Sequence, residues 1–149
     1  MTESIKHYPF YISGVKQVFP NVPAGSPIYA SSVVVGNLVL VSGMTAQDVT
    51  TGTVLANGIV EQMTVCLDKV KAALEEVGSN MNNIVKTLIL LKHLEDYREM
   101  RKTELEYYQE HAKLLVEQPP ASTFLQPASL ARPEFLVEID VTAVVSRDK

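Results

Sequence analysis

Apolar and polar residues alternate along the last part of the chain, from Glu134 to Val145. A period of two, rich in β-branched residues, is typical of a strand that buries at least one face. Glu138 and Asp140 lie on the face opposite the main apolar set, so two carboxylates share one side of the predicted strand. On this pattern alone, a solvated strand face explains the pair. The apolar set consists of Phe135, Val137, Ile139, Val141, Ala143 and Val145.

Other strand-like runs are short and are bounded by residues that break regular structure. Gly36 and Asn37 separate two β-branched runs, which is typical of a tight hairpin. Pro119 and Pro120 end the element before them, because proline cannot occupy a helix interior or a central strand. We predict strands at residues 28–35, 38–41, 84–91 and 122–125, with loops at 48–58 and 127–133.

Two segments have the spacing of amphipathic helices. Residues 59–77 carry a single apolar stripe, and Gly78 is a natural residue to follow the helix end. Cys66 lies in this stripe, so we expect a buried structural thiol rather than a nucleophile. A second helix is predicted from Asp96 to about Val116. His111 near its end suits the negative end of the helix dipole.

The order of elements predicts an α+β fold: a mixed sheet with two helices covering one face. Residues 1–27 are irregular, apart from an aromatic cluster at 8–12 that suits an edge strand, and Pro20, Pro23, Gly25 and Pro27 interrupt regular structure there. No domain boundary is visible, so we expect one domain over residues 1–149. The uncovered sheet face is rich in valine, which indicates an oligomer.

Composition narrows the classes of function. The 149 residues include 46% hydrophobic and 20% charged residues, an ordinary globular mixture. The net charge of −4 offers no basic excess for binding a phosphate backbone, so nucleic acid is not an expected partner. No signal peptide or membrane-length apolar run is visible, so we expect a cytoplasmic protein without membrane association. The single cysteine and the His spacing fit no metal site.

Several segments in order resemble the RidA (YjgF-type) family of reactive-intermediate or imine deaminases, also labelled L-PSP endoribonuclease-like. The C-terminal signature is Pro120-Ala121, Leu130, Pro133 and then Val-Glu-Ile-Asp at 137–140. Further matches are Tyr29 with Asn37, Val-Ser-Gly at 41–43, Gly52, Val-Lys-Thr at 85–87 and Leu-Glu-Asp-Tyr at 94–97. Together the matches cover about residues 26–145.

This resemblance implies a chorismate-mutase-like α+β subunit in a homotrimer, with its sheets around a central barrel and pockets at the subunit interfaces. Members of the family hydrolyse enamine or imine intermediates to 2-keto acids and ammonia, with no metal or organic cofactor. The ligand expected in the interface cleft is therefore a small carboxylate metabolite.

Carried over residue by residue, the resemblance implies that Glu138 is catalytic and that Tyr29 and Gly43 bind substrate. Ser122 stands at the position of the family's arginine, whose guanidinium would hold the substrate carboxylate as a bidentate pair. A serine supplies neither charge nor fork, so we expect weak activity on ordinary 2-imino acids. Arg101 stands where the family has asparagine and is a candidate replacement, although a solvated helix arginine paired with a nearby glutamate also explains it.

Three functions therefore stay open at this stage. The first is a diverged deaminase or related hydrolase, and the second is a regulatory trimer that binds a small molecule without turnover. A ribonuclease or translation inhibitor is the least favoured, because the acidic chain shows no nucleic-acid footprint.

Overall fold

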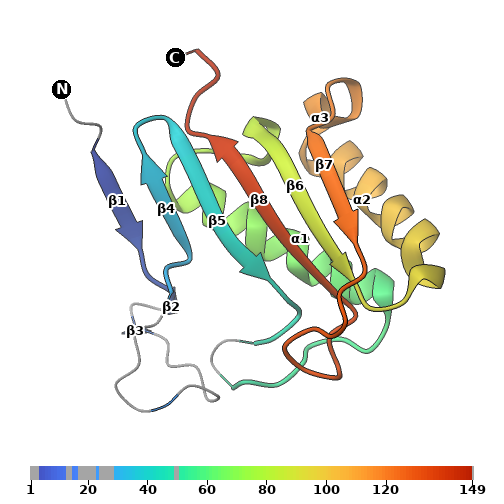
Figure 1. The fold of residues 1–149 in the computed structure, drawn as a ribbon. Coiled ribbons are helices and arrows are strands. Elements are labelled where there is room, and N and C mark those ends of the chain that lie inside the picture. The colour runs from blue at the N-terminus through green and yellow to red at the C-terminus, as the bar shows by residue number, and fades with distance from the viewer. Residues whose placement is uncertain (1–3, 13–14, 17–22, 24–28, 49–50, 149) are drawn as a thin grey trace.

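The computed structural model describes residues 4–12, 15–16, 23, 29–48 and 51–148, and Figure 1 shows their arrangement. Predictions that concern Pro20, Gly25, Pro27 and Ile28 lie outside these residues. The strands are β1 (Ile5–Tyr8), β2 (Tyr11–Ile12), β3 (Val15–Lys16), β4 (Ser32–Val35), β5 (Leu38–Met44), β6 (Ile84–Leu91), β7 (Ala121–Leu125) and β8 (Val137–Val144). The helices are α1 (Ile59–Glu76), α2 (Tyr97–His111) and α3 (Lys113–Glu117), with 3-10 turns η1 (Met81–Asn83) and η2 (Leu94–Asp96).

The described strands form one mixed sheet in the order β1-β4-β5-β8-β6-β7, while β2 and β3 form a separate ribbon. Its pairs are antiparallel except β6–β7, which is parallel. β8 lies inside the sheet between β5 and β6, two strands from distant parts of the chain. Helices α1 and α2 lie together on one face of the sheet (Figure 1), as the α+β prediction required.

The core lies between α1 and the covered face of the sheet. Alternate residues of β8 point into it, so the predicted two-residue period is confirmed. Cys66 is buried there, and burial raises the pKa of its thiol to about 12, which keeps it protonated at neutral pH. The side chains with no measurable exposure include Val39, Met63, Leu67, Val70, Leu74, Ile89, Val137 and Ile139.

The predicted hairpin is confirmed at the turn between β4 and β5. Val35 pairs with Leu38, and Gly36 has a φ of 58°, a left-handed conformation that glycine adopts without strain. The Asn37 side chain also donates to the carbonyl of Ser146 and accepts from its N–H. The hairpin is thereby fixed to the end of β8.

The prediction of a single helix from Asp96 to about Val116 was wrong. The backbone leaves the helical conformation at Ala112, with φ −152° and ψ 60°, and α3 follows as a separate turn. Ala112 is fully buried, and the Asn82 side chain accepts a 3.2 Å hydrogen bond from the Leu114 N–H. A tertiary contact therefore replaces a helical hydrogen bond at the break, and sequence periodicity does not report such a contact.

The edge strand of the sheet also differs from the prediction. The aromatic cluster at 8–12 does not form one strand, because Pro9 follows the end of β1 and brings no N–H to a ladder. β1 uses residues 5–8 instead and pairs with β4. β5 runs past its predicted end at Val41 to Met44, which pairs with Ile139 after a bulge.

The open face of the sheet, opposite α1 and α2, carries large apolar side chains as well as the two carboxylates. Leu38 is 40% exposed and Leu40 is 44% exposed, and both lie on this face beside Thr142 and Val144 of β8. Within the described residues, the helices are too short or too polar to cross a membrane.

Candidate functional site

A small cavity lies beside the bulge where β5 pairs with β8. Its volume is about 110 Å³. Tyr29, Gly43 and Glu138, three of the residues singled out from the sequence, lie in its wall. The other lining residues are Phe10, Met44, Thr45, Gln47, Lys69, Ala131 and Phe135.

Gly43 and Glu138 are in direct contact across the two strands. The pairing of β5 with β8 shifts register between Val41 and Met44, so the Gly43 backbone lies against the Glu138 carboxyl group. A β-carbon at position 43 would overlap the carboxylate oxygen Oε1 of Glu138. Glycine is therefore required here for the carboxyl group to occupy its place.

The Glu138 carboxyl group is held in an environment that favours its protonated form. Burial raises its pKa most, the charge of Asp140 raises it further, and Lys69 opposes both effects. Burial also raises the pKa of Asp140. A carboxyl group with a raised pKa in a cavity binds a proton more tightly than an exposed one, which suits it to receive and return a proton.

Tyr29 forms the outer wall of the cavity. Its ring meets the ring of Phe10 edge to face, with centroids 5.9 Å apart. Burial and the nearby charge of Glu138 raise the pKa of its hydroxyl, so the phenol stays protonated. Ser42 anchors the segment, because its hydroxyl donates to the carbonyl of Ala30.

Lys69 reaches the cavity from α1. Its ammonium donates to the carbonyl of Thr45 at 2.8 Å and to the carbonyl of Gln47 at 3.0 Å. Burial lowers its pKa, while Cys66, Asp48 and Glu138 each act to raise it. The sequence pattern placed Lys69 outside the apolar stripe of the helix, among residues with no assigned role.

The remaining wall comes from the segment before β8, which Gln62 holds to α1. The buried Gln62 side chain donates to the carbonyls of Ala56 and Glu134 and accepts from the Leu136 N–H. Phe135 is buried in this segment, and the Arg132 guanidinium lies over its ring. A glutamine at position 62, on the apolar side of the predicted helix, is the sequence signal that could have indicated this anchor.

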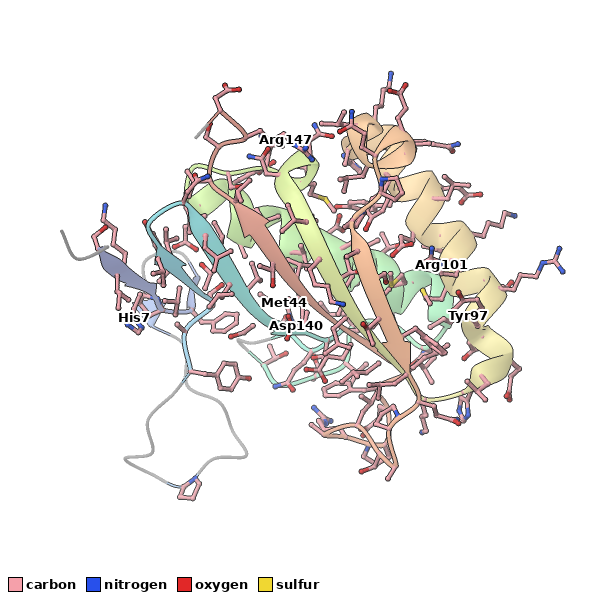
Figure 2. All side chains as sticks on the ribbon, turned by 45° about the horizontal axis from the view of Figure 1, so that its top comes forward. His7, Met44, Tyr97, Arg101, Asp140 and Arg147 are labelled. Atoms are coloured by element: carbon pink, nitrogen blue, oxygen red, sulfur yellow. The ribbon has the colours of Figure 1, made fainter. Side chains whose placement is uncertain are left out.

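Ser122 and Arg101 do not line this cavity. Ser122 lies on the edge strand β7, where its hydroxyl accepts a 2.8 Å hydrogen bond from Thr87. Arg101 lies on α2 and pairs with Glu104 at 2.9 Å. Figure 2 shows it on the helix side of the molecule, apart from Met44 and Asp140. The substrate-binding roles of both residues stay predictions.

Known proteins are similar to this chain in both sequence and fold. The model of the family described as "Endoribonuclease L-PSP" matches residues 20–145. The chain belongs to this family. It is 31% identical over 130 residues to a RutC family protein of Pyrococcus abyssi, with 86% of this chain and 96% of the relative covered. It is 32% identical over 124 residues to the Escherichia coli 2-iminobutanoate/2-iminopropanoate deaminase, covering 83% and 92% of the two chains.

Solved structures of YjgF proteins have a similar fold. The YjgF gene product of E. coli has a TM-score of 0.70 at 30% identity, with 87% of this chain and 98% of that chain covered. A Neisseria meningitidis member of the YjgF family has a TM-score of 0.69 at 26% identity, with 95% and 94% covered. The resemblance to the RidA (YjgF-type) family is thereby confirmed.

The cavity of this L-PSP family chain combines a proton acceptor, a hydroxyl group and a cation. Among the described residues, no cluster of three or more His, Cys, Asp or Glu side chains could hold a metal ion. The chemistry that the side chains support is proton transfer to and from a small polar ligand.

Proposed function

We propose that this chain hydrolyses small 2-imino acids, or their enamine tautomers, to 2-keto acids and ammonia. One observation carries the proposal: the Glu138 carboxyl group lies against Gly43 in a cavity shared with Tyr29. The printed name of the E. coli relative, a 2-iminobutanoate/2-iminopropanoate deaminase, supports the same substrate class.

The side chains suit the proton transfers of this reaction. Glu138 takes a proton from water, whose oxygen adds to the imine carbon and forms a tetrahedral carbinolamine. The imine reacts in its protonated form, so the nitrogen of the carbinolamine already carries two hydrogens, and Glu138 returns the water proton to it as the third. The carbon–nitrogen bond then breaks, ammonia leaves, and the hydroxyl proton passes to the Glu138 carboxylate as the ketone forms. The raised pKa of Glu138 makes it a stronger proton acceptor than an ordinary carboxylate, as an acid–base role requires.

We also propose that the chain acts as a homotrimer with the cavities at subunit interfaces. The exposed leucines of β5 on the open face of the sheet support burial against another copy. In such an assembly, residues of a neighbouring subunit would complete each site. We propose a cytoplasmic location for this assembly.

Turnover of ordinary 2-imino acids should be slow. A serine hydroxyl at position 122 cannot form the bidentate, charge-assisted pair that a guanidinium forms with a carboxylate. This same feature favours a second candidate function, a regulatory trimer that binds a small carboxylate without turnover. Ribonuclease activity is the least favoured, because the net charge of −4 gives little attraction for nucleic acid.

Ammonia release from freshly generated 2-iminobutanoate tests the proposal. Wild-type protein should accelerate release above the rate in buffer, and Glu138→Gln should abolish the acceleration by removing the proton acceptor. Glu76→Gln, on the exposed face of α1, is the control and should retain the wild-type rate. Wild-type protein that binds 2-oxobutanoate but releases no ammonia would instead support the regulatory trimer.

A further inference from the structure

Lys69 places a positive charge in the wall of the cavity that contains Glu138. Of the described residues that line this cavity, Lys69 is the only lysine or arginine. Ser122, at the family's arginine position, lies outside this wall. The cationic group available to a ligand in this cavity therefore comes from α1.

The Lys69 ammonium is fixed in place and keeps a donor for a ligand. A lysine ammonium has three N–H donors. Two of them bond the carbonyls of Thr45 and Gln47, which directly follow β5. Among the described residues, the third donor has no protein acceptor. Neither carbonyl neutralises the ammonium, and the charges of Asp48 and Glu138 favour its protonated form, so the group stays a cation that can attract an anionic ligand.

The charge balance of the cavity also requires a cation. A 2-imino or 2-oxo acid brings a carboxylate close to Glu138, and two carboxylates at short distance in a partly buried site repel each other. An ammonium in the same wall offsets that repulsion. Tyr29 and Gly43 carry no positive charge.

We propose that the ammonium of Lys69 binds the substrate carboxylate, in place of the guanidinium that position 122 lacks. The inference rests on the proposed function and adds an orientation to it: carboxylate towards Lys69 and imine carbon towards Glu138. A single ammonium beside Glu138 matches one negative charge on the ligand. The site therefore selects short monocarboxylates over dicarboxylates.

Binding of a stable analogue tests this role without turnover. 2-Oxobutanoate and its neutral amide, 2-oxobutanamide, differ in the charge that Lys69 recognises. Lys69→Gln keeps N–H donors for the two carbonyls but removes the charge. Calorimetric titration should show that this substitution weakens 2-oxobutanoate binding by roughly 10- to 100-fold. The affinity for 2-oxobutanamide should be unchanged.

Two further variants separate charge from structure. Lys69→Arg keeps a cation and should retain 2-oxobutanoate binding within a few-fold. Lys71→Gln removes a lysine that pairs with Glu75 on the same helix and should have no effect. Equal weakening of both ligands by Lys69→Gln would show a structural role only and would overturn the inference.

The test is separable from the test of the deaminase itself. Lys69-dependent binding of 2-oxobutanoate without ammonia release would leave the inference standing while the proposed function fails. Ammonia release whose KM is unchanged in Lys69→Gln would overturn the inference while the function stands. Should Lys69→Gln not fold, the side-chain NMR signal of Lys69 in wild-type protein decides. That signal should shift with 2-oxobutanoate but not with the amide, and no shift overturns the inference.

Discussion

The Glu138 carboxyl group occupies the space that a β-carbon at position 43 would fill, so a residue other than glycine could not stand there without displacing that group. The two residues come from adjacent strands, and their contact exists because the sheet shifts register between Val41 and Met44. The position of the proposed catalytic group thus depends on the absence of a side chain.

Gly43→Ala should therefore displace Glu138 without changing its chemistry. The overlapped atoms belong to the end of a flexible side chain, so the fold should survive and the carboxyl group should move. We expect kcat for ammonia release to fall by ~10-fold or more. Gly58→Ala is a matched control, because its new β-carbon meets the end of Glu61, away from the cavity. Equal activity of both variants would contradict the assigned contact.

Glu138→Gln should change how stability depends on pH. The folded protein raises the pKa of Glu138 above its unfolded value of 4.5, mainly by burial, so the folded state binds the proton more tightly. The stability from this group is present below that unfolded value and is lost as pH rises through the folded pKa. As the pH rises from about 4 to about 7, the free energy of unfolding of the variant should therefore increase relative to that of the wild type. Urea denaturation at both pH values measures it, and a pH-independent difference would contradict the pKa direction.

Ser122→Arg should raise activity on 2-iminobutanoate. The substitution adds a cation that can pair with a carboxylate, at the cost of the hydrogen bond from Thr87. We expect kcat/KM to rise by ~10-fold or more, the effect of a charge-assisted pair. Leu105→Arg, which adds the same charge on α2, is the control. Thr123→Arg is a second comparison, because Thr123 pairs with Leu88 on the open face that also carries Glu138 and Asp140, whereas Ser122 pairs with Thr87 on the face that the helices cover. Wild-type turnover as fast as that of an arginine-bearing relative would show that position 122 has been misjudged.

Leu40→Arg should separate the proposed trimer into monomers. Light scattering of wild-type protein should give about three times 16.4 kDa, and the variant should give a single subunit mass. A charge on the open face of the sheet would be buried at the interface without a partner, which is costly. Leu105→Arg is the control. Leu105 is 45% exposed and Leu40 is 44% exposed, but Leu105 lies on α2 rather than on the open face of the sheet. A monomeric wild-type protein would remove both the trimer and its interface sites.

Arg101→Ala distinguishes a structural arginine from a substrate-binding one. The Arg101 side chain is 43% exposed and pairs with Glu104, whose side chain is 7% exposed. Removing the partner of a buried carboxylate should lower the free energy of unfolding by about 1 kcal/mol. Lys102→Ala breaks the 3.9 Å pair with Glu106 on the exposed surface and should cost almost nothing. Lost 2-oxobutanoate binding in Arg101→Ala would favour the substrate-binding prediction.

The sequence predicted the elements whose patterns are local. The alternation around Glu138, the hairpin at Gly36 and the stripe of α1 each depend on neighbouring residues, and the structure agrees with them. The helix break at Ala112 was missed because it depends on a contact with Asn82. Periodicity contains no information about such a distant partner.

The candidate site was only partly predictable for the same reason. Tyr29, Gly43 and Glu138 were found through family motifs, and one cavity contains all three. Lys69 was missed because a charged residue beside an apolar stripe is usually solvated. Its two carbonyl acceptors lie in a loop more than twenty residues earlier, as the sequence separations of 24 and 22 indicate.

The central position of β8 also constrains biosynthesis. β8 is the last described strand along the chain, yet it joins β5 to β6. Until residues 137–144 have left the ribosome, β4–β5 and β6–β7 remain two half-sheets with unpaired apolar edges. Such edges are templates for aggregation, so the nascent chain is most vulnerable just before β8 emerges. Translation pauses in this window should therefore raise the demand for chaperones more than pauses elsewhere in the message.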